Sequence, residues 1–152
     1  MRFTVAMLAT LFASSALTSP EDAKQGRYAL SAWQCFAYAS NAGRNEEVER
    51  FFNLGFEAAK KFLEAARANK ISREDADSNT PMIVLWSSQG PTVDFAAGRI
   101  FEAVSAQTYR DMAEKDSTGM TLPVDKWITD KETTLKSIGE NKYRTSNCEL
   151  IK

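Results

Sequence analysis

The residue types that could carry out catalysis are restricted by one absence, because the 152 residues of this chain include no histidine. Catalysis by Ser-His-Asp or Cys-His groups, His-Glu-x-x-His zinc proteases, histidine phosphotransfer and histidine-ligated c-type haem are therefore excluded. No Gly-Lys-Ser or Gly-Lys-Thr phosphate loop and no Gly-x-Gly-x-x-Gly nucleotide motif occurs. We expect neither a cofactor nor a metal ion, and the composition favours a protein that is not an enzyme.

Carboxylate chemistry is the one catalytic route that this composition leaves open. A glycosidase needs only two acids that flank a sugar, one of them with a raised pKa. Four acids lie within or beside apolar stripes of expected helices, namely Glu57, Glu64, Asp94 and Glu102. We favour the simpler interpretation, in which each is a solvated charge at the edge of a helix, and keep a glycan-acting enzyme as an alternative.

The segment from Trp86 to Glu102 is the most unusual in the chain. Its Gly-Pro turn precedes a helix, is rigid, and can present backbone N–H groups to an anion or to a carboxylate of a partner. Arg99 stands three residues before Glu102 and can pair with it. The segment predicts a recognition loop, although an ordinary interhelical turn whose arginine–acid pairs stabilise the core edge has the same features. The candidate partner-binding residues are Trp86, Ser88, Gln89, Gly90, Pro91, Asp94, Arg99 and Glu102.

The two cysteines, Cys35 and Cys148, indicate a disulfide. Such a bond persists in an oxidising compartment. It would close a loop of 112 residues, which stabilises a fold by about 4–5 kcal/mol in the chain-entropy model. Two buried free thiols are the alternative.

The first residues have the pattern of a secretory signal peptide. Arg2 supplies a positive charge, residues 4–13 are apolar apart from two threonines, and Ser14, Ser15 and Ala16 are small enough for signal peptidase. The apolar run is shorter than the ~20 residues that cross a bilayer. We expect cleavage after Ala16, while an uncleaved helix packed on the domain is the alternative.

Cleavage would leave a single domain of residues 17–152 without a membrane insertion. Residues 1–16 hold one of the 19 basic residues and none of the 20 acidic ones, so the remaining chain has a net charge of −2. This mild acidity gives no support for a nucleic acid or an anionic membrane surface as partner. The expected location is the periplasm or the extracellular space.

Helix start and stop signals recur along the whole of this domain. Ser19 and Pro20, followed by two acids, form a strong start for a first helix that ends before Gly43. Further starts are expected at Asn45, Ser72, Thr80–Pro81, Pro91 or Thr92, and Asp125. The expected helices cover residues 20–42, 45–69, 82–86, 92–112 and 125–142, with a loop at 116–123.

The predicted fold is therefore all-α, an irregular bundle of about five helices joined by one disulfide. Residues 82–85 could form a strand, but no second strand is available to pair with it. Gly55 and Gly98 stand inside helices, where glycine costs about 1 kcal/mol relative to alanine. We expect close helix–helix approach at both.

The layout also resembles a known family. Tyr28-Ala29-Leu30-Ser31 and then Cys35 follow the signal peptide on the first helix, and Cys148 stands in the tail of an all-helical body. This is similar to the periplasmic immunity proteins against type VI secreted peptidoglycan amidases. The resemblance implies a small helical protein, often dimeric, that binds and blocks an amidase with a loop. Residues 82–102 have no counterpart in that family's pattern.

Together these features predict an exported protein that binds another periplasmic protein, with inhibition of a cell-wall hydrolase as its specific form, and a homodimer is compatible with them. The first alternative is a periplasmic stress chaperone that exposes apolar helix faces on acidification. Its working surface would be the second helix, with Phe51, Phe52, Phe56 and Phe62. The second alternative is the carboxylate-dependent enzyme.

Overall fold

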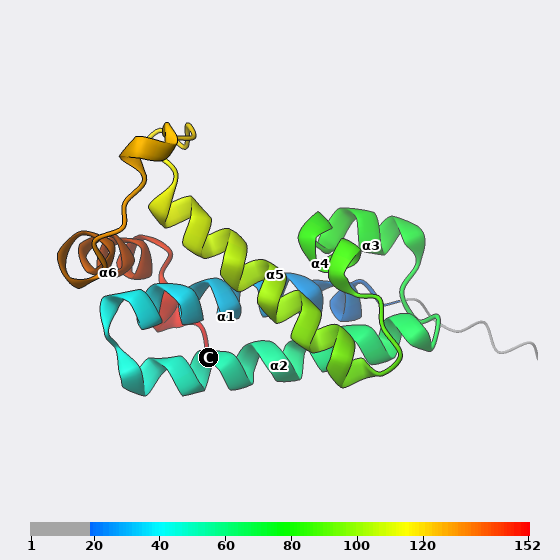
Figure 1. The fold of residues 1–152 in the computed structure, drawn as a ribbon. Coiled ribbons are helices and arrows are strands. Elements are labelled where there is room, and N and C mark those ends of the chain that lie inside the picture. The colour runs from blue at the N-terminus through cyan, green and yellow to red at the C-terminus, as the bar shows by residue number, and fades with distance from the viewer. Residues whose placement is uncertain (1–18) are drawn as a thin grey trace, which may run out of the picture.

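The computed structural model describes residues 19–152, and this part of the chain is all-α. Its helices are α1 (Pro20–Ala42), α2 (Asn45–Arg67), α3 (Arg73–Asn79), α4 (Met82–Ser87), α5 (Val93–Ala113) and α6 (Lys136–Thr145), with short helical turns at Val124–Lys126, Lys131–Leu135 and Cys148–Leu150. The predicted irregular bundle is confirmed (Figure 1). None of the described helices is both long and apolar enough to cross a membrane. The predicted signal peptide, residues 1–16, lies outside the described residues.

The ends of α1 follow the local signals of the sequence. The hydroxyl of Ser19 accepts a hydrogen bond from the backbone N–H of Asp22, and Pro20 occupies the first turn. Gly43 ends the helix in the left-handed conformation, with φ of 76°, which glycine adopts without the steric cost of a side chain. The expected start of α2 is wrong by one residue. Arg44 occupies the N-cap position without a side-chain hydrogen bond, and Asn45 is already helical.

Helices α1 and α2 lie antiparallel (Figure 1), and Gly55 of α2 packs closely against Trp33 of α1. A Cβ atom at Gly55 would lie under 3.0 Å from the indole of Trp33, so the prediction of close approach is confirmed there. Trp33 is completely buried and donates its Nε1–H to the carbonyl of Phe52 at 3.3 Å. The glycine therefore makes room for the central aromatic side chain of the core.

Helix α5 crosses this pair, and α3 and α4 cover the end of α1 where α1 begins (Figure 1). The main core joins apolar side chains of four helices, with Trp33, Phe62, Val84 and Ile100 among them. Thr80 was expected to cap α4, but it is buried and its hydroxyl donates to the carbonyl of Ala23 at 2.9 Å. The Thr80 hydroxyl therefore bonds to α1 and does not cap α4.

The expected helix over residues 125–142 is wrong in its first half. The carboxylate of Asp130 accepts hydrogen bonds from the backbone N–H groups of residues 132–134 and so caps a helix that begins only at Lys131. A hydrogen bond from the hydroxyl of Thr133, followed by bonds from the backbone N–H of Thr133 and from the hydroxyl and N–H of Thr134, holds the pKa of Asp130 down at about 2. Residues 127–130 are extended, and Trp127 donates its indole N–H to the carbonyl of Leu122.

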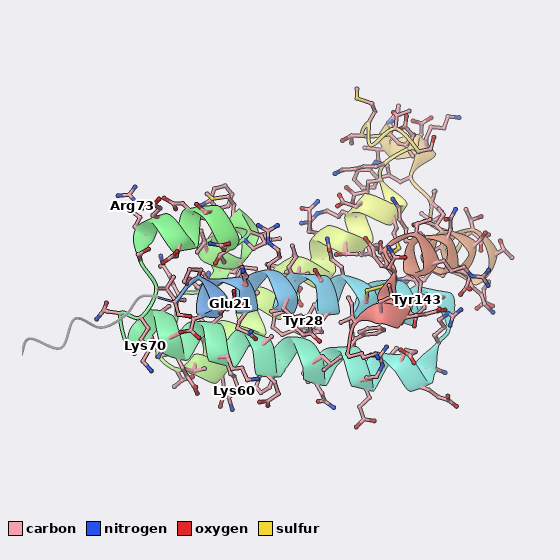
Figure 2. All side chains as sticks on the ribbon, turned by 180° about the vertical axis from the view of Figure 1, so that it is seen from behind. Glu21, Tyr28, Lys60, Lys70, Arg73 and Tyr143 are labelled. Atoms are coloured by element: carbon pink, nitrogen blue, oxygen red, sulfur yellow. A yellow bond between two sulfur atoms is a disulfide. The ribbon has the colours of Figure 1, made fainter. Side chains whose placement is uncertain are left out.

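Several contacts fix α6 and the C-terminal segment against the α1–α2 pair. Cys35 and Cys148 form the predicted disulfide, with their Cα atoms 5.6 Å apart. Arg50 and Tyr28 donate to the last two backbone carbonyls of the chain. In Figure 2, Tyr28 and Tyr143 lie on the side where this segment runs. The tail is therefore part of the folded body.

Helix α6 packs closely on α1 and is anchored by an ion-pair cluster. A Cβ atom at Gly139 would lie 2.9 Å from the backbone nitrogen of Ala42. Glu140 accepts two hydrogen bonds of 2.8 Å from Arg44, and one of 2.7 Å from Arg144. These bonds from two guanidinium groups, that of Arg44 first, hold the pKa of Glu140 down at about 2.

Candidate functional site

Exposed apolar side chains gather where α4 meets the beginning of α5. The side chains of Met82, Trp86 and Phe95 are 53%, 73% and 53% exposed. We call the surface that they form with Gly98 and the charged residues beside it the α4–α5 face. Its residues are Met82, Trp86, Ser87, Asp94, Phe95, Gly98, Arg99 and Glu102.

The loop of residues 88–92, which joins the two helices, is held rigidly by two arginines. Arg67 of α2 donates hydrogen bonds of 2.9 Å to the carbonyls of Gly90 and Thr92, and a longer one of 3.5 Å to that of Pro91. Arg99 of α5 donates to the carbonyl of Gln89 at 2.7 Å. All four consecutive carbonyls of residues 89–92 thus have a guanidinium partner, so the loop lies pinned against the helices.

The loop also fixes the exposed ring of Phe95. A Cβ atom at Gly90 would lie under 3.0 Å from that ring, so the glycine allows backbone and ring to pack together. Thr92 caps α5 by accepting a hydrogen bond of 3.1 Å from the backbone N–H of Phe95. The orientation of this ring is therefore set in the free protein.

A shallow hollow of about 520 Å³ surrounds Gly98. Phe95, Ser87 and Ala103 supply its uncharged walls, and Asp94, Arg99 and Glu102 its charged ones. A Cβ atom at Gly98 would meet nothing within 4 Å. The predicted close helix–helix approach is therefore wrong at this glycine, which faces open space.

A second hollow of about 490 Å³ lies on the other side of α4. It is bordered by Trp86 and Met82 of α4, by Leu30 and Gln34 of α1, and by Val104 of α5 among others. Trp86 and Ser87 are neighbours in the chain, so the end of α4 separates the two hollows. The exposed indole of Trp86 forms part of the wall of this second hollow.

The structure brings most of the predicted partner-binding residues together. Asp94, Arg99 and Glu102 border one hollow and Trp86 borders the second, while Gln89, Gly90 and Pro91 accept hydrogen bonds from Arg67 and Arg99 through their carbonyls. The hydroxyl of Ser88 donates to the carbonyl of Leu85 and ends α4.

The expected pairing of Arg99 with Glu102 is replaced by the bond of Arg99 to the loop. Within residues 19–152, Arg99 forms no ion pair. Asp94 lies 3.9 Å from the ammonium group of Lys60.

Met82 and Phe95 belong to this surface, but the sequence did not indicate them as candidate binding residues. Apolar residues on a helix are normally assigned to the core, and nothing in their spacing marks these two as exposed. The position of Phe95 three residues after a capping threonine was the only local signal, since it places the ring beside the preceding loop.

The four acids considered for glycan chemistry do not form an enclosed pair. All four are exposed, with Glu57 and Glu64 on α2 and the other two on α5. Asp94 and Glu102 share the hollow around Gly98 but stand eight residues apart, a helical rise of about 12 Å. Each carboxylate contacts solvent, so none of the four lies in the enclosed cleft that a pair of glycosidase acids requires. Among residues 19–152, no group of three or more His, Cys, Asp or Glu residues is placed to hold a metal ion.

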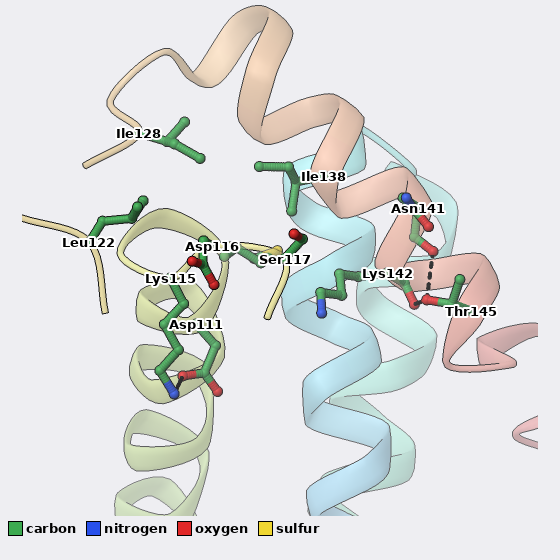
Figure 3. A pocket seen from close by; sticks show the side chains of 11 residues that line it. Asp111, Lys115, Asp116, Ser117, Leu122, Ile128, Ile138, Asn141, Lys142 and Thr145 are labelled. Carbon is green, nitrogen blue, oxygen red and sulfur yellow. Dashed lines mark hydrogen bonds and ion pairs between the residues drawn. The ribbon is translucent and has the colours of Figure 1, made fainter. Parts of the chain in front are cut away.

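A third hollow, of about 410 Å³, lies between the end of α5, the segment 114–130 and α6 (Figure 3). Its two carboxylates already have structural roles. Lys115 pairs with Asp111 at 2.6 Å. Asp116 accepts hydrogen bonds from the hydroxyl of Thr118 and from backbone N–H groups, and these lower its pKa. The carboxylates therefore shape the loop and are not free for a ligand.

The segment 114–130 projects from the body of the molecule beyond the end of α5 (Figure 1). It carries exposed apolar side chains of its own, Met120 at 69% and Val124 at 73% exposure. This segment is the competing candidate for a binding surface. It has short turns in place of the two helices that support the α4–α5 face.

Comparison with known protein families, characterised proteins and solved structures found no match for this chain. The functional argument therefore rests on the surface geometry.

Proposed function

We propose that this chain is an exported helical protein that acts by binding another protein through the α4–α5 face, as an inhibitor or immunity protein of a cell-wall hydrolase. The observation that carries the proposal is the exposure of Trp86 and Phe95 on neighbouring helices, with the ring of Phe95 packed against Gly90. Large aromatic side chains are the residues that most often dominate protein–protein binding energy, and they do so best when they are held in place before binding.

Three further features support this function. The disulfide indicates an oxidising compartment outside the cytoplasm, which agrees with export to the periplasm. The loop 88–92 and the ring of Phe95 are already ordered, so a partner would pay little conformational entropy for them. The absence of histidine from the sequence favours binding over most forms of catalysis.

The chaperone alternative receives less support from the packing. Phe51 and Phe62 are buried in the core, and Phe52 and Phe56 stack against each other with Phe101 beside Phe52. Phe52 is 37% exposed, but Phe51 and Phe62 are buried and Phe56 is half-buried, so most of the proposed chaperone surface would become accessible only on unfolding.

The test is retention of a partner from periplasmic extract by the oxidised protein and by two matched variants. Trp86→Ala removes the indole from the α4–α5 face, and Val124→Ala removes a side chain of equal exposure from the segment 114–130. We expect a stoichiometric protein to be retained by the wild type and by Val124→Ala, to be lost with Trp86→Ala, and to have a peptidoglycan-hydrolysing activity that the wild type blocks.

Retention of no protein under several growth conditions would contradict a protein-binding function. A partner lost with Val124→Ala and kept with Trp86→Ala would move the binding surface to the segment 114–130. A retained protein without hydrolase activity would contradict the inhibitor form of the proposal.

A further inference from the structure

We infer that the hollow around Gly98 receives an apolar side chain from a helix of the partner, and that basic side chains flank this apolar residue. The inference rests on the proposed protein-binding function and specifies the chemistry of the partner. Its three grounds are the open space above Gly98, the fixed walls of the hollow, and the charges at its two ends.

The first ground is that Gly98 has no role within the fold that alanine could not fulfil. It lies in the interior of the 21-residue helix α5, where glycine is unfavourable relative to alanine. Gly55 and Gly139 offset the same disadvantage by allowing a neighbouring helix to approach, but a Cβ atom at Gly98 would meet nothing within 4 Å. A glycine at position 98 is explained if a side chain of another molecule packs against it.

The second ground is that the walls of the hollow are fixed before binding. Gly90 and the cap of Thr92 hold the ring of Phe95 on one side. Arg99 is bonded to the loop and borders another side. A hollow with such walls offers an apolar side chain contact with an aromatic ring and with helix backbone at the same time.

The third ground is the charge pattern along α5. Asp94 and Glu102 stand four residues before and four residues after Gly98, and both border the hollow. A helix laid along α5 with its apolar residue over Gly98 would place its own residues four positions away beside these two acids, whichever direction it runs. Two cations also lie here, since Arg99 borders the hollow with its guanidinium bonded to the loop and Lys60 lies 3.9 Å from Asp94. A basic side chain of the partner would therefore complement Glu102, which forms no ion pair within residues 19–152, and would compete with Lys60 for Asp94.

The same pattern argues against a second copy of this chain as the occupant. If two α5 helices crossed at Gly98, a parallel arrangement would place Asp94 against Asp94 and an antiparallel one would place it against Glu102. Like charges are opposed in both cases, which disfavours the contact. We therefore assign the hollow to a different protein.

The experiment uses two synthetic helical peptides as probes of the oxidised, ¹⁵N-labelled protein. Each is an alanine-based peptide of about 18 residues, long enough to be partly helical, with one central leucine. One peptide has lysine four residues before and after the leucine, and the other has glutamate there. Amide shifts in the ¹H–¹⁵N spectrum report the site and the affinity of each peptide.

We expect the lysine peptide to shift the amides of Phe95, Gly98 and Glu102, and to bind about tenfold more tightly than the glutamate peptide, a ratio that decreases at high salt. The combined change Asp94→Asn with Glu102→Gln should abolish the ratio, while Glu132→Gln, an exposed acid at the other end of the molecule, should preserve it. Gly98→Leu should remove the shifts for the lysine peptide.

No shift with either peptide, equal shifts with both, or shifts confined to the segment 114–130 would overturn the inference. A partner that is retained from periplasmic extract by the variant with Asp94→Asn and Glu102→Gln as well as by the wild type would overturn it too, and would leave the protein-binding function in place. Failure to retain any partner is a separate result, which concerns the proposed function.

Discussion

Replacement of Gly98 by alanine should stabilise the free protein and weaken its binding at the same time. The new Cβ atom meets nothing within 4 Å, so the substitution adds no clash. It removes the entropic disadvantage of glycine in a helix interior, which is about 0.5–1 kcal/mol. A gain of this size corresponds to an increase in Tm of about 2–4 °C for a domain of this length.

Gly55→Ala is the matched control, because it makes the same chemical change in another helix. Its Cβ atom would lie under 3.0 Å from the completely buried indole of Trp33. Forcing extra volume into a packed core costs about 1–3 kcal/mol, which outweighs the gain in helix propensity. The two variants should therefore differ in the sign of their effect.

The assay is equilibrium unfolding in urea with the disulfide intact, which gives the free energy of unfolding from the midpoint and the slope. We expect a higher midpoint for Gly98→Ala and a lower one for Gly55→Ala, with unchanged slopes. A lower midpoint for Gly98→Ala would refute the reasoning, since it would mean that the glycine serves the fold and not a partner.

Three further outcomes follow from the same contacts. Replacing both Cys35 and Cys148 by serine should lower the free energy of unfolding by about 2–5 kcal/mol, and urea unfolding at neutral pH measures this; a loss below about 0.5 kcal/mol would contradict the role given to the disulfide. The pKa of Glu140 is lowered to about 2 in the folded protein, so its stabilising contribution is present above its ordinary pKa and is lost as the pH falls from about 5 to 2. Urea midpoints across this range should therefore fall less steeply for Glu140→Gln than for the wild type, and equal slopes would show that the cluster with the two arginines is absent in solution. Arg67→Met should release the loop before α5 without unfolding the core, which faster amide exchange of residues 89–92 would show and unchanged exchange would disprove.

The sequence was most informative where a local signal had no competitor. Helix α1 begins after Ser19 and ends before Gly43, as expected, because a capping hydroxyl and a left-handed glycine each act within a single helical turn. The disulfide was also predictable, since two cysteines have only one way to pair with each other.

The errors arose where a distant or competing contact used the same group. The hydroxyl of Thr80 bonds to a carbonyl of α1, 57 residues away in the chain, and no local pattern reports such a partner. Asp130 caps a helix more effectively than Asp125 because its carboxylate reaches three backbone N–H groups, which moves the start of the last helical region from residue 125 to residue 131.

The sequence predicted the region of the chain that forms the candidate site, but it did not predict all of the residues that form it. The unusual turn before α5 indicated the correct region, and Trp86 was selected with it. Whether Gly98 faced a helix, as Gly55 does, or open space depended on the tertiary arrangement of α4 and α5, which spacing along one helix does not reveal. The same is true of the exposure of Phe95.

Photo-crosslinking inside the periplasm tests the central claim most directly. A benzophenone amino acid is placed at position 95 in one variant and at position 124 in another, both of them exposed in the free protein. The account predicts one crosslinked protein of defined mass from position 95 and none from position 124, with the crosslink weakened by Gly98→Leu. A crosslink formed only from position 124, or none from either position, would contradict it.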